Sequence, residues 1–343
     1  MKARSEVGIG IVGMGFMGTT HFLAGASLEG GKVVSIVTRD PRKARGDFKS
    51  VRGNFGQGGG KLDLRGVKVH PTLDSILADE AVDLVDICLP SFLHSWVALQ
   101  ALRAGKHVLV EKPVALSGTD ARAMIATARQ RKRLLMVAQV LKFFPEFSLI
   151  PRSLGDGRWG KLLALHLRRA IAFPDWGTQS WFGDASKSGG MVVDLHIHDT
   201  DFVLFLFGKP RGVASSGLVR KGRVDFIRTF YRYGPGAPLL SSEAGWINSP
   251  GLPFKHGYDA YFEKGTLQFD SSRSPAPVLF DGKGLKELEL PQVDGFREEL
   301  QAAVNGVREG KAPRSLSAHS AALSLEVCRA EEKAAKTGKV VKL

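Results

Sequence analysis

The sequence predicts two domains, a doubly wound α/β domain over residues 1–140 and an α+β domain with an open, mostly antiparallel sheet over residues 141–343. A chain of 343 residues has the length of two domains at roughly 150 residues each. Up to about residue 140, short β-branched runs alternate with helical patterns, which is typical of a parallel sheet covered on both faces. Beyond that point strands follow one another without helices between them, which favours an α+β arrangement.

The first domain is divided by its apolar runs. The predicted strands are Val7–Val12, Lys32–Thr38, Val67–His70, Asp83–Leu89, His107–Val110 and Leu134–Val140, and the helices between them begin near Met17, Pro41, Leu73, Leu93 and Ser117. The segment 53–66 has six glycines and no period of either kind, so it is expected to be a surface loop or a cover near a bound cofactor.

The second domain has longer runs. Its predicted strands are Leu162–Ala172, Val213–Val219, Val224–Tyr233, Leu239–Trp246 and Tyr258–Phe269, with one strongly apolar helix near Gly190–Phe207 and two closing helices at Gly295–Arg308 and Ala318–Thr337. Apolar residues on both alternations of the strand run 224–233 predict that one sheet face packs on helices and the other on a partner subunit. We therefore expect a homodimer or homotetramer.

The composition excludes several classes of protein. The sequence has only two cysteines, Cys88 and Cys328, which are far apart along the chain. They cannot build a disulfide framework or a paired-cysteine zinc site, so a reducing cytoplasm is expected. No run approaches the roughly 18 apolar residues of a membrane span, so no membrane partner is expected. Part of the net charge of +14 lies in residues 39–70 and 122–142. These segments contain no recognisable helix of the kind that contacts bases in nucleic acids. We expect no nucleic-acid partner, and instead an anionic ligand near residue 39.

A glycine motif follows the first predicted strand. The sequence from Gly13 to Gly18 is a GxGxxG with Gly15 at its centre, placed between a strand and a helix. In this context the first glycine permits a tight turn, the second lets backbone amides approach a pyrophosphate, and the third allows close packing of helix on strand. The motif predicts a Rossmann domain that binds a dinucleotide.

The end of the second strand indicates which dinucleotide is bound. An NAD-specific domain usually has an acid about 20 residues after the last glycine, where this chain has Thr38 followed by Arg39. A hydroxyl with a guanidinium suits a 2′-phosphate. Asp40 is the alternative, as an acid shifted by two positions or as a helix cap before Pro41. The pattern favours NADP over NAD.

Several further motifs occur in a fixed order. Glu111-Lys112-Pro113 follows the fifth strand, Pro90 to His94 follow the fourth, Ala104 to Val108 precede the fifth, and Gly189-Gly190 is followed by Asp194 and His198. Together with the terminal Thr337 to Val341, this set resembles the glucose-fructose oxidoreductase, inositol dehydrogenase and MocA family of NAD(P)-dependent enzymes over nearly the whole chain.

The resemblance implies roles for these residues. Lys112 would lie between nicotinamide and substrate, Asp194 and His198 would match the family's DxxxH pair, and the Lys112–Pro113 bond would be cis. The expected cofactor contacts are Gly13, Gly15, Phe16, Met17, Gly18, Thr38, Arg39, Leu89, Pro90, His94, Glu111 and Lys112. The chain departs from the family at Lys142, where arginine is usual, and at His196, where many members have glycine.

The stretch around Asp194 also admits a metal site, since two histidines two residues apart face the same way on a strand. On a helix of 100° per residue, Asp194, His198 and Asp201 share one narrow stripe, whereas His196 lies on the opposite side. The following apolar run ends at Gly208, as expected of a buried helix. We therefore expect a helix and no metal, with His196 a packing residue or a secondary substrate contact.

The expected reaction is reversible hydride transfer between C4 of a nicotinamide and a carbinol carbon of a sugar, sugar derivative or cyclitol. His198 would be the general base, Asp194 would orient its ring, and Lys112 would stabilise the alkoxide or relay the proton. Trp181, Trp176 and Phe182 are candidates for stacking on a sugar or for packing. Two alternatives remain open: a redox-assisted glycoside hydrolase whose cofactor is reduced transiently, and a non-catalytic NADP sensor.

Overall fold

The computed structural model describes residues 6–53, 59–174, 178–247, 251–273 and 276–343. The chain forms two compact units, one made of Met1–Val140 and Asp294–Ala322, the other of Leu141–Val293 and Leu323–Leu343. The predicted boundary after residue 140 coincides with the end of the first segment. The predicted extent of the second domain differs, because residues 294–322 return to the first unit.

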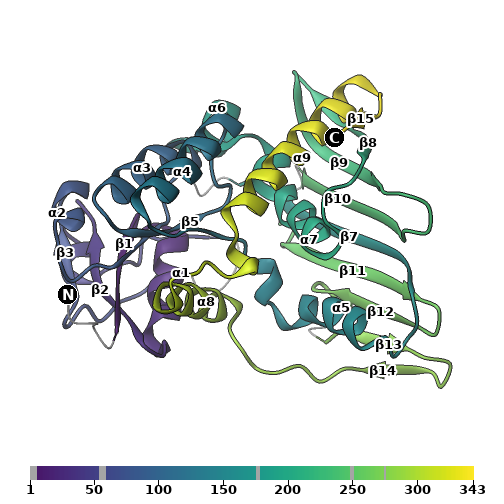
Figure 1. The fold of residues 1–343 in the computed structure, drawn as a ribbon, viewed down its shortest axis with the longest axis horizontal. Helices are drawn as coiled ribbons and strands as arrows, with labels where there is room; N and C mark the ends of the chain where they lie inside the picture. Colours follow the sequence, from purple (N-terminus) through teal and green to yellow (C-terminus); the bar gives the residue numbers. More distant parts are fainter. Residues whose placement is uncertain (1–5, 54–58, 175–177, 248–250, 274–275) are drawn as a thin grey trace. The chain divides into compact units, whose positions relative to one another are not determined.

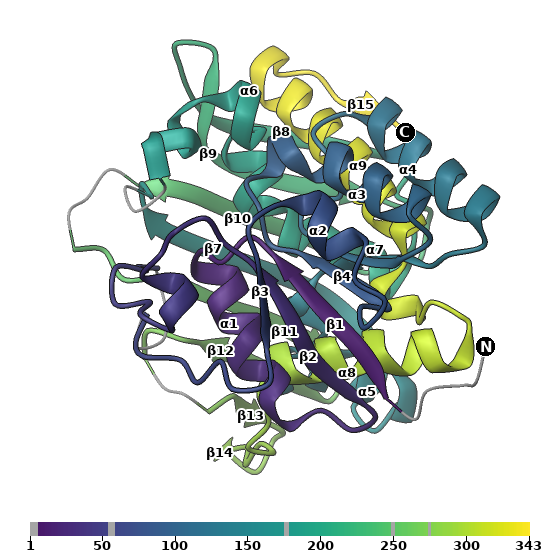
Figure 2. The ribbon, with the colours of Figure 1, turned by 90° about the vertical axis from the view of Figure 1, so that its left-hand side faces the viewer.

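Unit 1 contains a six-stranded parallel sheet in the order β3-β2-β1-β4-β5-β6 (Figures 1 and 2). The strands are β1 (Val7–Val12), β2 (Gly31–Val37), β3 (Lys68–His70), β4 (Leu84–Ile87), β5 (His107–Glu111) and β6 (Leu135–Ala138). Strands β1, β4 and β6 are buried throughout, as expected of a sheet covered on both faces. The predicted doubly wound sheet is confirmed.

Helices cover both faces of this sheet. They are α1 (Phe16–Ala24), α2 (Leu73–Leu77), α3 (His94–Arg103), α4 (Gly118–Arg131) and α8 (Gly295–Glu309). Helices α3 and α4 lie side by side, as do α1 and α8 (Figure 1). The contact of α8 with α1 and β1 explains why residues 294–322 belong to this unit.

The helix predicted to begin near Pro41 is wrong. The chain forms only a 3₁₀ turn at Lys43–Arg45, which ends at Gly46 in the left-handed region with φ of +83°. A residue in this conformation ends a helix, and glycine adopts it at little cost. Further 3₁₀ turns in the described part of the chain are Gly25–Ser27, Ser91–Leu93, Val140–Phe143, Thr178–Gly183 and Arg314–Leu316.

Unit 2 contains a nine-stranded sheet in the order β14-β13-β12-β11-β7-β10-β9-β8-β15. Its strands are β7 (Leu162–Ala172), β8 (Gly212–Arg220), β9 (Arg223–Arg232), β10 (Leu239–Ile247), β11 (Lys255–Phe262), β12 (Gly265–Asp270), β13 (Val278–Phe280), β14 (Leu285–Glu287) and β15 (Val341–Lys342). Among its described pairings, β7 with β10 is parallel and the others are antiparallel. The predicted α+β arrangement is confirmed.

Two buried apolar clusters pack helices of unit 2 against this sheet. The helical segments of the unit are α5 (Pro145–Asp156), α6 (Ala185–Ser188), a π-helix at Val192–His196, α7 (Ile197–Phe207) and, from residue 323 onward, α9 (Ala318–Thr337). Residues of α5, the π-helix, α7 and α9 belong to these clusters. The single strand predicted over Tyr258–Phe269 is wrong: Phe262 and Gly265 pair across a tight turn that joins β11 to β12. Within the described residues, no helix is long and apolar enough to cross a membrane.

Candidate active site

The glycine turn after β1 has the geometry that the motif predicts. Gly13 has φ of +104°, and a Cβ there would lie 2.6 Å from the carbonyl oxygen of Cys88. A Cβ at Gly18 would lie 2.0 Å from the carbonyl oxygen of Gly13, whereas one at Gly15 would meet no atom within 4 Å. Among the described residues, no side chain caps the first turn of α1, and backbone N–H groups at such a helix start can bind phosphates. These residues fit a dinucleotide.

Thr38 and Arg39 directly follow β2, at the same edge of the sheet as the glycine turn. The hydroxyl of Thr38 accepts the backbone N–H of Asp40 at 3.2 Å. The carboxylate of Asp40 accepts the backbone N–H of Arg42 at 2.8 Å, which matches its reading as a cap. Arg39 is exposed.

Two contacts at the glycine turn join residues far apart in the chain, so no local sequence pattern predicts them. The ammonium of Lys43 donates to the carbonyl oxygen of Met14 at 2.8 Å, which brings a positive charge against the turn. Gly53 lies on the ring of Phe16, where a Cβ would approach to 2.1 Å. The glycine-rich segment 53–66 therefore begins beside the motif, as expected of a cover near the cofactor, and the close approach explains the glycine.

Leu89 and Pro90 follow β4 and continue the same edge. Leu89 Cδ2 would lie 3.0 Å from a Cβ at Gly13, so this segment packs on the glycine turn. The two ring nitrogens of His94 lie 2.7 Å from the carbonyl oxygens of Leu89 and Pro113, and burial lowers the pKa of His94. The ring thus lies between two backbone segments, and in its neutral form it donates to one of these two oxygens. The cofactor contact of His94 stays a prediction.

Glu111 and Lys112 end β5, the next strand along the edge. Glu111 is buried, and its Oε2 accepts the backbone N–H of Lys112 at 3.0 Å. Lys112 is half-buried, and the Lys112–Pro113 bond is cis, as the resemblance implies. The predicted cofactor-binding segments of unit 1 follow β2, β1, β4 and β5, which are neighbours in the parallel sheet. They therefore lie together at the carboxyl ends of the strands, which form one edge of the sheet.

Asp194 and His198 lie in unit 2, at the start of its apolar helix. The regular α-helical spacing predicted here is wrong over Val192–His196, because this stretch is a π-helix with a wider i→i+5 turn. Asp194 is buried and His198, four residues later in α7, is half-buried. Single π-turns inside helices are frequent at functional sites. Because Lys112 belongs to the other unit, its position beside this pair remains a prediction.

The polar residues around this pair have partners of their own. His196 is fully buried, and its Nε2 lies 3.3 Å from Ser242 Oγ and 3.6 Å from Glu331 Oε2, so it is a packing histidine. Asp199 accepts two hydrogen bonds from the guanidinium of Arg169 at 2.9 and 3.0 Å.

Asp201, predicted on the same stripe as Asp194 and His198, is buried and forms an ion pair with Lys142 at 2.7 Å. It also accepts a hydrogen bond from Ser324 at 2.9 Å. Lys142 is the position at which the chain departs from the family's arginine. In this structure Lys142 pairs with Asp201, and both residues belong to unit 2.

The three aromatic residues proposed to stack on a sugar or to pack, Trp176, Trp181 and Phe182, have different outcomes. Trp181 stacks on Phe182 with ring centroids 4.0 Å apart, and Phe182 packs on Trp246, so Phe182 is a packing residue. Substrate stacking by Trp181 remains a prediction, and Trp176 lies outside the described residues.

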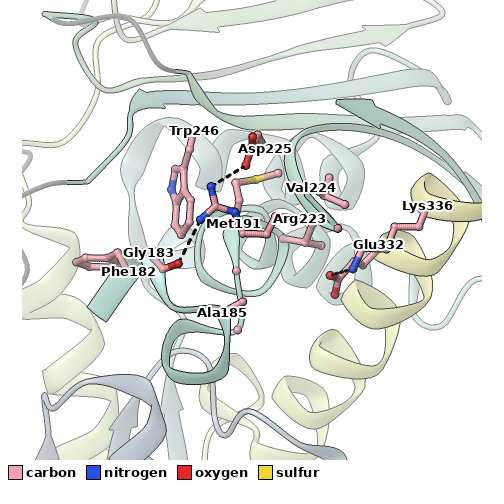
Figure 3. A pocket seen from close by; sticks show the side chains of 14 residues that line it. Phe182, Gly183, Ala185, Met191, Arg223, Val224, Asp225, Trp246, Glu332 and Lys336 are labelled. Carbon is pink, nitrogen blue, oxygen red and sulfur yellow. Dashed lines mark hydrogen bonds and ion pairs between the residues drawn. The ribbon is translucent and has the colours of Figure 1, made fainter. Parts of the chain in front are cut away.

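A hollow on unit 2 lies beside Phe182 and the Gly189–Gly190 turn, between β9 and α9 (Figure 3). Its charged side chains pair with one another, Arg223 with Asp225 at 3.9 Å and Lys336 with Glu332 at 2.7 Å. Neither Asp194 nor His198 lines it. We therefore do not place the substrate there.

The fold of unit 1 and its glycine turn are those of a dinucleotide-binding domain, and the family models define the class as oxidoreductase. The family model "Oxidoreductase family, NAD-binding Rossmann fold" matches residues 7–139, and the model "GFO/IDH/MocA C-terminal domain" matches residues 149–268. The chain belongs to the Gfo/Idh/MocA family of oxidoreductases.

Individual relatives cover nearly the whole chain. A 1,5-anhydro-D-fructose reductase of Ensifer adhaerens is 24% identical over 97% of this chain and 98% of its own. Inositol 2-dehydrogenase 2 of Saccharopolyspora erythraea is 26% identical over 88% and 86%. A solved levoglucosan dehydrogenase in complex with NADH and levoglucosan superposes with a TM-score of 0.81 at 20% identity, over 98% of this chain and 99% of that chain.

Proposed function

We propose that this enzyme catalyses reversible hydride transfer between C4 of a nicotinamide dinucleotide and a carbinol carbon of a sugar, sugar derivative or cyclitol. The observation that carries this proposal is a half-buried lysine, Lys112, at the carboxyl end of β5, the edge at which open parallel sheets bind their ligands. The names of the relatives, an anhydrofructose reductase and an inositol dehydrogenase, support the substrate class.

The chain's own residues would handle the proton. When bound, the nicotinamide supplies the hydride acceptor. His198 takes the proton of the substrate hydroxyl, and Asp194 orients the imidazole so that the accepting nitrogen faces the substrate. The ammonium of Lys112 stabilises the negative charge that develops on the alkoxide oxygen, or relays its proton.

We propose NADP as the preferred cofactor. Thr38 and Arg39 stand where an acid would bind a ribose 2′-hydroxyl, and Asp40 caps the following turn. The contact of Lys43 with Met14 places a second cation against the glycine turn. A 2′-phosphate is more compatible with this charge than a neutral hydroxyl.

Replacing Arg39 by serine is expected to weaken NADP⁺ binding by about 10-fold or more, since a hydrogen bond to a charged group contributes roughly 1.5–3 kcal/mol. NAD⁺ binding should change little. Fluorescence titration with both cofactors measures the effect, with the exposed arginine Arg103 at the end of α3, changed to serine, as the control. An equal loss for both cofactors, or no loss, would contradict the NADP assignment.

We also propose that the chain is a homodimer or homotetramer through the exposed face of the unit 2 sheet. One row of directly paired residues crosses five neighbouring strands, β10, β7, β11, β12 and β13, and its side chains therefore face the same side of the sheet. The row consists of Leu239, Ala164, Tyr261, Thr266 and Phe280. Leu239, Tyr261 and Phe280 are exposed, which forms an apolar row that a second copy would cover.

Sedimentation velocity at micromolar concentration is expected to show a dimer or tetramer, and Leu239→Asp with Tyr261→Asp should shift it to monomer. The exposed Leu23 of unit 1, changed to aspartate, is the matched control. A monomeric wild-type protein would contradict this proposal.

The proposed function is tested by mixing the protein with NADP⁺ or NAD⁺ and a panel of sugars, cyclitols and glycosides, while following absorbance at 340 nm and product masses. A keto product formed together with reduced cofactor is the expected result. Cleavage of a glycoside without net reduction would indicate the redox-assisted hydrolase, and a stable ternary complex without turnover would indicate the sensor.

A further inference from the structure

A buried histidine of α1 joins two carboxylates beneath the edge that carries Lys112. His21 is fully buried, and its Nδ1 lies 2.8 Å from Oδ2 of Asp86, a fully buried residue of β4. Its Nε2 lies 3.2 Å from Oε1 of Glu111. The other oxygen of Glu111 accepts the backbone N–H of Lys112 at 3.0 Å. A continuous polar chain thus runs from β4 through α1 to the backbone of Lys112.

When the imidazole carries a proton on both nitrogens, the positive charges of His21 and Lys112 together match the negative charges of Asp86 and Glu111. Burial opposes the charged ring, but the contacts of the imidazole with Cys88 and with the carboxylate of Asp86 outweigh burial and raise the pKa of His21 well above its usual range. Burial also raises the pKa of the Cys88 thiol, so the thiol stays neutral and the negative charge comes from the carboxylates. Burial likewise opposes the charge of Glu111, but the contact with His21 lowers its pKa overall.

A buried charge network contributes little stability compared with apolar packing, and it is costly when one member is removed. Here it fixes the two oxygens of Glu111, one on His21 and one on Lys112. Since α1 also begins at the glycine turn, His21 and Glu111 link this helix to the backbone of Lys112.

We propose that His21 is a positioning residue for Lys112: by bridging Asp86 and Glu111 it holds the backbone of Lys112 and balances the charge near its ammonium. This inference rests on the role proposed above for Lys112. His21 is fully buried and would touch neither the substrate nor the reacting atoms.

The first test needs no turnover. The rate of acetylation of Lys112 by acetic anhydride at pH 8, measured by peptide mass spectrometry against a reference lysine, reports how readily its ammonium loses a proton. His21→Gln removes a positive charge, which makes the Lys112 ammonium harder to deprotonate. Lys112 should therefore react about threefold more slowly, as it would if the pH were lowered by roughly half a unit. Glu111→Gln removes a negative charge, so Lys112 should react faster.

The matched control is His70→Gln. His70 is also a buried histidine of unit 1, and its Nε2 lies 2.9 Å from Asp79 Oδ2, a separate pair. This variant should lose comparable thermal stability and leave the reactivity of Lys112 unchanged. If His21→Gln does not fold, the opposite-sign prediction for Glu111→Gln decides alone.

The second test uses the sugar identified by the panel. His21→Gln is expected to lower kcat on the order of 100-fold, as a displacement of a reacting group by about 1 Å does, while cofactor Kd changes little. The double variant with Glu111→Gln should lose little more than the worse single variant, because both remove one link.

The outcomes separate the two claims. If no alcohol is oxidised but the reactivity of Lys112 moves with the predicted signs, the proposed function fails and the positioning role stands. If His21→Gln behaves like His70→Gln in reactivity and kcat, the positioning role is wrong. Stoichiometric zinc in the purified protein, lost on Cys88→Ser, would also overturn it, because His21, Asp86 and Cys88 would then be metal ligands.

Discussion

Replacing Lys112 by methionine is expected to lower kcat by about 10³-fold, because proton transfer and charge stabilisation by a positioned group contribute roughly 10²–10⁴-fold. Methionine keeps much of the length of the side chain but offers neither charge nor proton. The dinucleotide Kd should change much less than kcat, since the glycine turn and the residues after β2 are expected to supply the phosphate contacts. Steady-state kinetics together with cofactor titration measure both quantities.

The control for this variant is Lys32→Met, which removes an exposed lysine near the start of β2, at the opposite edge of the sheet. It should keep wild-type kcat. A Lys112→Met enzyme with near-wild-type kcat would show that the proton and the alkoxide charge are handled elsewhere.

Replacing His198 by asparagine is expected to lower kcat by about 10²–10³-fold, because the general base is lost. The wild-type rate should fall as the pH is lowered, since a protonated imidazole cannot accept the hydroxyl proton. In the variant this acidic limb should disappear, because no group is left whose protonation switches the reaction off. A pH–rate profile from pH 5 to 9 measures the change.

His196→Asn is the matched control, because His196 lies two residues away and contacts Ser242 and Glu331 in the interior of unit 2. It should cost thermal stability and keep the acidic limb. If His196→Asn removes the limb and His198→Asn keeps it, the two histidines have been assigned the wrong roles.

Local sequence signals predicted much of the fold and the cofactor edge. Strands β1 and β7 have the predicted bounds, since continuous or alternating apolar residues mark them directly. Gly13 and Gly18 also have the predicted geometry, because a steric requirement of the turn leaves a glycine in the sequence.

The features that were missed depend on contacts far apart in the chain. His21 and Asp86 are 65 residues apart, and Lys43 contacts Met14 across 29 residues, so no periodicity reveals either pair. The π-turn at Val192–His196 is likewise a tertiary feature within an ordinary helical pattern. The helix expected at Pro41 failed because Gly46 ends it after one turn.

The most direct test of hydride transfer is an isotope experiment. A substrate found in the panel, carrying deuterium on its reacting carbinol carbon, is incubated with NADP⁺, and the reduced cofactor is analysed by NMR and mass spectrometry. We predict one deuterium at C4 of the nicotinamide, on a single face, together with the keto product. Reduced cofactor without deuterium, or deuterium released to water, would contradict the account.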